Sequence, residues 1–64
     1  MNEIRILLVE DNEGDILLTM EAFSELKAGT RIDVVRDGAE ALTYLRREGK
    51  FSQSLPPQLI LLDI

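Results

Sequence analysis

The stretch IRILLVEDN, residues 4–12, decides how the rest of the chain is interpreted. Its segment Ile4–Val9 is a short apolar run interrupted only by Arg5, which is typical of a buried strand covered on both faces. The run ends in two acids, Glu10 and Asp11, and a potential helix N-cap, Asn12, follows at once. We therefore predict a buried strand that delivers two carboxylates to the start of a helix.

The segments that follow alternate between helical and strand patterns. The first predicted helix begins at Asn12, with Asp15 at capping-box spacing, and Gly29 is its expected stop. Its apolar stripe is Ile16, Leu17, Met20, Phe23 and Leu26. The half-polar RIDVV, residues 31–35, predicts an edge strand.

The second half of the chain repeats the alternation. The spacing of Asp37 and Glu40 predicts the start of a second helix, with Gly49 as its stop and Tyr44 as a half-exposed residue. The two prolines of FSQSLPPQ mark a loop, and LILLD at residues 59–63 predicts a strand that is apolar on both faces and therefore central.

The order strand, helix, strand, helix, strand predicts an α/β fold with a parallel sheet and right-handed crossovers. Because the half-polar strand belongs outside, we expect the strand order 2-1-3, the beginning of a flavodoxin-like doubly wound sheet. Residues 1–64 form one unit without an internal boundary.

The composition excludes several classes of function. The 64 residues include 12 acids, 7 bases, no histidine and no cysteine, and the net charge is -5. A disulfide framework and a zinc site built on cysteine or histidine are therefore excluded, and the acidic balance argues against nucleic-acid binding. No apolar run approaches the roughly 20 residues that cross a membrane. We expect a cytoplasmic protein that folds with a partner or as part of a larger domain, because cores of this size are marginal.

Three carboxylates are expected at the same edge of the sheet. Glu10 and Asp11 follow the first strand and Asp63 ends the third, and ligands of open parallel sheets bind beyond these strand ends. Mg²⁺ prefers a few carboxylate oxygens and leaves positions for phosphate oxygens. The alternative is that these acids cap helices and keep the surface soluble. Glu13 and Asp15 are expected to complement the helix dipole from its first turn and not to bind a ligand. The two interpretations stand about even on the residues alone.

The motifs ILLVEDN, DGAEAL and PQLILLDI, in this order and spacing, resemble the receiver domain of bacterial response regulators, and most of all the stand-alone receivers that partner bacteriophytochromes. The resemblance implies that Asp63 accepts a phosphoryl group from a sensor histidine kinase. It also implies that Asp11 binds Mg²⁺ directly and that Glu10 acts through a metal-bound water. The chain would be a phospho-accepting signalling protein and not an enzyme in the usual sense.

The resemblance also implies what is missing. A receiver has five strands, and residues 1–64 would supply three, without the hydroxyl residue, the lysine and the aromatic switch residue that follow later. We therefore expect these residues alone to be inactive. Two alternatives stay open: a half-domain that self-associates as a homodimer through the edge of the third strand, and a phosphatase of the haloacid-dehalogenase type.

Overall fold

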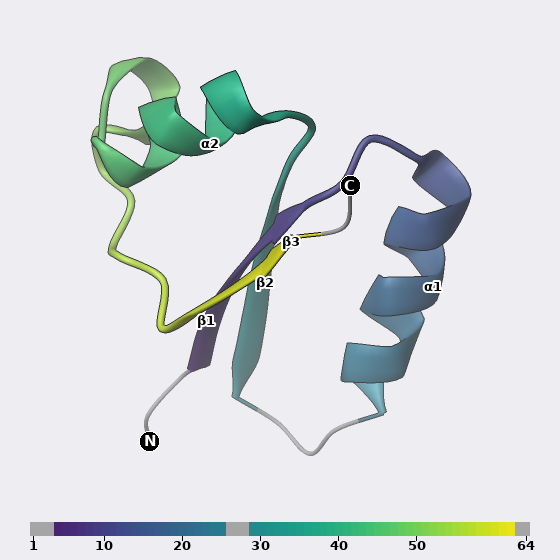
Figure 1. Ribbon diagram of the computed structural model, residues 1–64. Helices are drawn as coiled ribbons and strands as arrows, with labels where there is room; N and C mark the ends of the chain where they lie inside the picture. The colour runs from purple at the N-terminus through teal and green to yellow at the C-terminus, as the bar shows by residue number, and fades with distance from the viewer. Residues whose placement is uncertain (1–3, 26–28, 63–64) are drawn as a thin grey trace.

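The computed structural model describes residues 4–25 and 29–62. Strands and helices alternate along the chain as predicted (Figure 1). The elements are β1 (Ile4–Val9), α1 (Glu13–Ser24), β2 (Thr30–Val35), α2 (Gly38–Leu45), the short 3₁₀ helix η1 (Gly49–Phe51) and β3 (Leu59–Leu62). Within these ranges no helix is long and apolar enough to cross a membrane.

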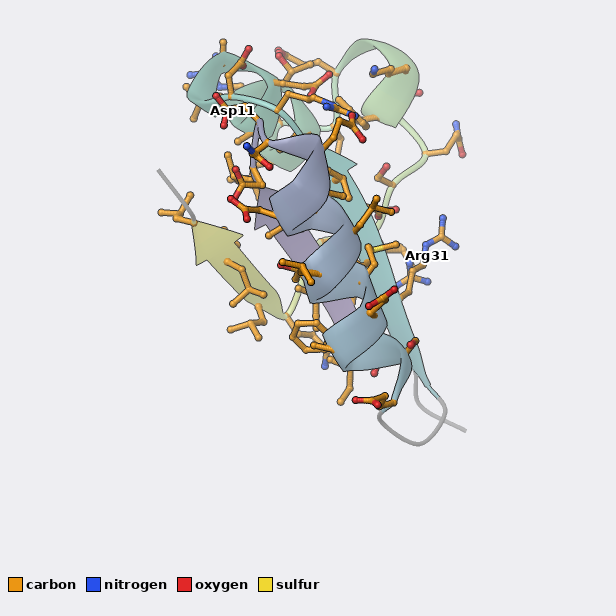
Figure 2. All side chains as sticks on the ribbon, turned by 90° about the vertical axis from the view of Figure 1, so that its right-hand side faces the viewer. Asp11 and Arg31 are labelled. Atoms are coloured by element: carbon orange, nitrogen blue, oxygen red, sulfur yellow. The ribbon has the colours of Figure 1, made fainter. Side chains whose placement is uncertain are left out.

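The three strands form a parallel sheet in the order β2-β1-β3, which confirms the predicted order 2-1-3. Val9, the last residue of β1, lies opposite Val35 on one side and Leu62 on the other. The carboxyl ends of all three strands therefore lie together at one end of the sheet, which is the edge where the candidate site lies. Figure 2 shows that Asp11 lies at this edge and Arg31 toward the opposite end.

The core is built around β1, which is the central strand. Leu7 is fully buried, and Ile6 and Leu8 on the opposite face are almost as inaccessible. Leu7 and Val9 belong to a buried cluster whose other members come from β2 and α2: Val35, Ala41 and Tyr44. The two helices lie on opposite sides of the sheet (Figure 1). A strand covered on both faces needs a continuous apolar run, which explains the sequence of β1.

Helix α1 is less buried than its apolar spacing predicts. Of the expected stripe, Ile16 is buried and Phe23 is half-buried, whereas Leu17 and Met20 are exposed. Leu26 lies outside the described residues. The predicted apolar stripe is thus exposed at Leu17 and Met20, because a sheet of three strands offers the helix less surface than the stripe covers.

Both predicted N-caps are present. The Asn12 side chain accepts a hydrogen bond from the Asp15 amide at 3.0 Å, and the Asp37 side chain accepts one from the Glu40 amide at 2.7 Å. The Glu40 carboxylate accepts a bond from the Arg36 amide at 2.8 Å, one residue before the cap. The reciprocal pairing of a capping box is therefore displaced by one position in α2.

The helices end earlier than the glycines predict. Helix α1 ends at Ser24 and α2 at Leu45, so neither Gly29 nor Gly49 closes a helix. Helix α2 ends in a Schellman motif, in which the Glu48 amide donates to the Thr43 carbonyl at 3.1 Å. The left-handed position of this motif is occupied by Arg47, with φ 56°, instead of glycine. Gly49, with φ 55°, begins η1.

Strand β3 lies at the edge of this three-stranded sheet and is not covered on both faces. Three of its four side chains, Leu59, Ile60 and Leu62, are exposed, so the prediction of a central strand was wrong for the described residues. The apolar run predicts the strand correctly, but the burial of a strand also needs a neighbour on each side, and among residues 4–25 and 29–62 β3 pairs with β1 alone.

Candidate functional site

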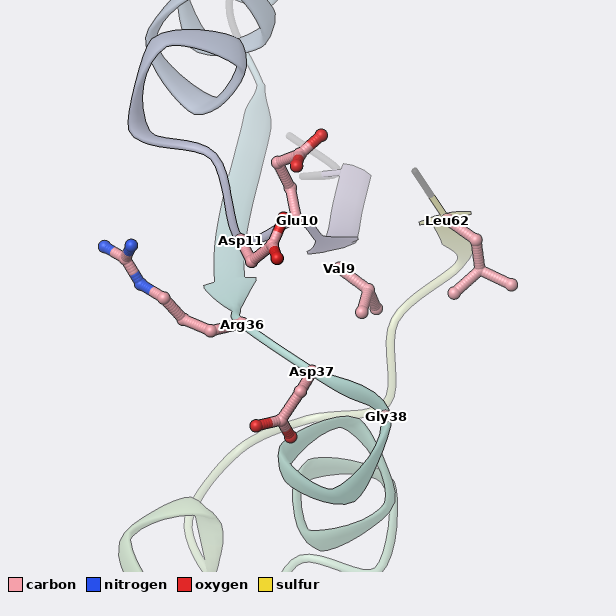
Figure 3. Close-up of a pocket in the computed structure, with 7 residues that line it drawn as sticks. All are labelled: Val9, Glu10, Asp11, Arg36, Asp37, Gly38 and Leu62. Atoms are coloured by element: carbon pink, nitrogen blue, oxygen red, sulfur yellow. The ribbon is translucent and has the colours of Figure 1, made fainter. Parts of the chain in front are cut away.

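A pocket of about 290 Å³ lies at the edge where the strands end. It is bounded by the end of β1, the β2–α2 turn and the end of β3 (Figure 3). Its lining residues are Val9, Glu10, Asp11, Arg36, Asp37, Gly38 and Leu62. The predicted Glu10 and Asp11 therefore line one pocket, at the end of the sheet that topology favours for ligands.

The two predicted carboxylates differ in exposure. Glu10 is the one buried charged residue among those described, at 4% exposure, whereas Asp11 is exposed. The Glu10 carboxylate accepts a hydrogen bond from the Asn12 amide at 3.0 Å, and the Glu10 amide donates to the Val35 carbonyl at 3.0 Å. These bonds fix Glu10 between the end of β1, its neighbour β2 and the start of α1.

Asp63, the third predicted carboxylate, lies outside the described residues. Leu62, the residue before it in the chain, lines the pocket. Within residues 4–25 and 29–62 no group of three or more acidic, histidine or cysteine side chains could hold a metal ion. The meeting of Glu10, Asp11 and Asp63 thus stays a prediction.

The sequence interpretation missed the contribution of the β2–α2 turn. Arg36, Asp37 and Gly38 line the pocket, and the Arg36 guanidinium forms an ion pair with Glu13 in the first turn of α1. The available signal was the strand order, because Arg36 directly follows β2 and therefore lies at the same edge as Glu10. Asp37 has the predicted capping role in addition to its place at the rim.

Comparison with solved structures gives a close relative in fold and sequence. The crystal structure of the phosphorylated cyanobacterial phytochrome response regulator RcpA matches with a TM-score of 0.90 and 45% identity, over 97% of this chain and 44% of that chain. The chain is homologous to response regulators. This match confirms the flavodoxin-like fold and agrees with the predicted similarity to regulators that partner phytochromes.

Two curated relatives support the response-regulator homology. A probable methanogenesis regulatory protein, FilR2, from Methanothrix harundinacea is 48% identical over 59 residues, which cover 92% of this chain and 37% of the relative. The response regulator Rcp1 from Synechocystis is 37% identical over 59 residues, with 92% and 40% coverage. The chain thus spans less than half the length of these two relatives. No protein-family model matches it.

The comparisons do not favour either alternative from the sequence. Rcp1 and RcpA are response regulators, and neither the haloacid-dehalogenase type of phosphatase nor the self-associating half-domain gains support from the relatives. The resemblance to response regulators, drawn from the three sequence motifs, is therefore confirmed. The roles of Glu10, Asp11 and Asp63 remain to be argued from the pocket.

Proposed function

We propose that the protein is a phosphorelay receiver in which Asp63 accepts a phosphoryl group from the phosphohistidine of a sensor histidine kinase. The observation that supports this best is the carboxylate pair Glu10 and Asp11 at the end of the central strand. The pair lines a pocket together with Leu62, which directly precedes Asp63 in the chain. The related RcpA structure is described as phosphorylated.

The described residues fit a divalent cation of the hard type. Mg²⁺ sites in proteins commonly use one or two carboxylates, retain several waters and leave room for phosphate oxygens. Asp11 is exposed beside the pocket and would bind the ion directly, whereas Glu10 is buried and one of its oxygens is occupied by the Asn12 amide. Glu10 would therefore act through a metal-bound water.

The reaction would be a displacement at phosphorus. A carboxylate oxygen of Asp63 forms a bond to phosphorus while the bond to the donor nitrogen breaks, and the histidine of the kinase leaves with the electron pair. Bound Mg²⁺ would neutralise negative charge on the transferring oxygens. The residues of this chain would orient the ion and supply the nucleophile, so the protein would be a phospho-acceptor and not a classical enzyme.

The proposal concerns the natural protein that carries these residues, because response-regulator relatives are more than twice as long as the matched segment. We expect residues 1–64 alone to be inactive, since the receiver resemblance places other phosphoryl-binding groups in later strands. The likeness to the phytochrome response regulator RcpA supports a phytochrome-type kinase as the donor.

The test is labelling of the natural protein by a small phosphodonor such as acetyl phosphate. We expect labelling that requires Mg²⁺ and that hydroxylamine removes, because an acyl phosphate on a carboxylate is cleaved by this nucleophile whereas phosphoserine is not. The labelled residue is identified by peptide mass spectrometry after borohydride reduction. Labelling that persists in a metal chelator, or that resists hydroxylamine, would contradict the proposal.

A further inference from the structure

The ion pair of Arg36 is unexpected for its position. Val9 lies opposite Val35 in the β1–β2 register, and the next amide, that of Glu10, donates to the Val35 carbonyl at 3.0 Å. Glu10 and Arg36 therefore follow the ends of neighbouring strands. Opposite charges in such adjacent positions commonly attract each other. The strand register alone thus predicts that Arg36 pairs with the acids at the end of β1.

The structure shows a different partner. Arg36 Nη2 pairs with Glu13 Oε1 in the first turn of α1, and in Figure 3 the guanidinium points away from the Asp11 carboxylate. Arg36 is the only cationic residue lining the pocket within the described ranges 4–25 and 29–62. Its charge is therefore directed away from the Asp11 carboxylate.

We infer that Glu13 is a positioning residue, which holds the Arg36 guanidinium away from the pocket carboxylates and so keeps them available to a divalent cation. This inference rests on the proposed Mg²⁺ binding by Asp11 and Glu10. A guanidinium bound to Asp11 would compete with the ion for the same oxygens and would repel it. Without Glu13, the Arg36 guanidinium is free to pair with the carboxylates that line the same pocket.

The expected effect is small because the pair is exposed. The side chains of Arg36 and Glu13 are 51% and 67% exposed, so water and salt weaken the interaction. Exposed pairs of this kind change an equilibrium by about two- to fivefold. The effect should also fall as ionic strength rises.

The experiment is a calorimetric Mg²⁺ titration of the natural protein at low ionic strength, in four forms: wild type, Glu13→Gln, Arg36→Gln and the double variant. Asp15→Asn is the matched control, because Asp15 lies in the same first turn and loses the same charge without pairing with Arg36 in the structure. A second readout is the Arg36 Nε–H resonance in the metal-free protein, followed by NMR, with Asp11→Asn added to the Glu13→Gln form.

Glu13→Gln should weaken Mg²⁺ binding about two- to fivefold more than Asp15→Asn does. In the Arg36→Gln background, Glu13→Gln should have no more effect than Asp15→Asn, because no guanidinium remains to be held. In the metal-free protein, Glu13→Gln should shift the Arg36 resonance, and adding Asp11→Asn should change it again.

If Glu13→Gln weakens Mg²⁺ binding equally in the presence of Arg36 and in the Arg36→Gln variant, the inference is overturned. A simple loss of charge would then explain the effect. An Arg36 resonance that Glu13→Gln leaves unchanged would overturn it as well. If no form binds Mg²⁺, the proposed function fails, and the inference fails with it. An unchanged Arg36 resonance with normal Mg²⁺ binding would overturn the inference alone.

Discussion

Replacing Asp63 with Asn should abolish phosphoryl labelling of the natural protein. The amide lacks the anionic oxygen that attacks phosphorus, yet it keeps the size of the side chain, so the fold should be unaffected. The measurement is incorporation of labelled phosphoryl group from acetyl phosphate in the presence of Mg²⁺. We expect the incorporated label to fall to the background level of the assay.

The chain offers a matched control in Asp37→Asn. Asp37 lines the same pocket, and asparagine is as good an N-cap as aspartate, so α2 should keep its cap. Labelling of this control should stay within about twofold of wild type, because a surface charge change is usually small in effect. An Asp63→Asn protein that labels as strongly as Asp37→Asn would rule out Asp63 as the acceptor.

Tyr44 should contribute stability that is lost at alkaline pH. Its hydroxyl donates a 2.6 Å hydrogen bond to Asp33, and burial together with this bond raises the pKa of Tyr44 to about 12. Since the pKa in the folded protein lies above the unfolded value near 10, the contribution is complete below pH 10 and is lost as the pH rises through 12. A difference of two pKa units corresponds to on the order of 3 kcal/mol.

The measurement is urea unfolding of wild type and Tyr44→Phe between neutral and strongly alkaline pH. At neutral pH, Tyr44→Phe should lower the free energy of unfolding by about 1.5–3 kcal/mol, because it removes a hydrogen bond to a carboxylate. Its ring should still pack on Phe51, whose centroid lies 5.0 Å from that of Tyr44. The difference between the two proteins should then shrink above pH 10.

Residues 1–64 contain a single tyrosine, so tyrosinate absorbance of this segment reports Tyr44 directly. Asp33→Asn should move the titration of Tyr44 back toward its ordinary range, because the negative charge beside the hydroxyl is removed. A Tyr44 that titrates with an ordinary pKa in the folded wild-type protein would contradict this account.

The order of the strands in the sheet could be predicted because the apolar and polar patterns of the strands are local and strong. The apolar run of β1 requires cover on both faces, and Asp33 marks β2 as an edge strand, so the order 2-1-3 followed directly. The N-caps Asn12 and Asp37 were also predictable, since capping depends on residues three positions apart.

Features that depend on tertiary contacts were not predictable in the same way. Tyr44 was expected to be half-exposed on its helix. Instead, α2 lies against the sheet, and the Tyr44 hydroxyl reaches Asp33, the residue that makes β2 half-polar. Arg47 adopts the left-handed conformation that the pattern assigned to a glycine. The burial of Tyr44 depends on how α2 packs on the sheet, which residue spacing does not show, whereas the conformation of Arg47 follows from local hydrogen bonds at the end of α2.

The candidate site was predicted in part. Strand ends fix the positions of Glu10 and Asp11, so their place beside a pocket followed from topology. The pairing of Arg36 with Glu13 could not be predicted from topology. Two long side chains at the rim of the pocket have several possible partners, and the geometry of the turn decides which of them pair.

We expect Glu10, Asp11 and Asp63 to surround one divalent cation in the natural protein. Replacing Mg²⁺ with paramagnetic Mn²⁺, which favours the same oxygen ligands, tests it most directly through the broadening of backbone amide NMR signals in the natural protein. The account predicts that the signals of Glu10, Asp11 and Asp63 broaden first, while that of Arg31, toward the other end of the sheet, stays sharp. Broadening centred instead on the exposed acids Glu21 and Glu25, near the end of α1, would contradict it.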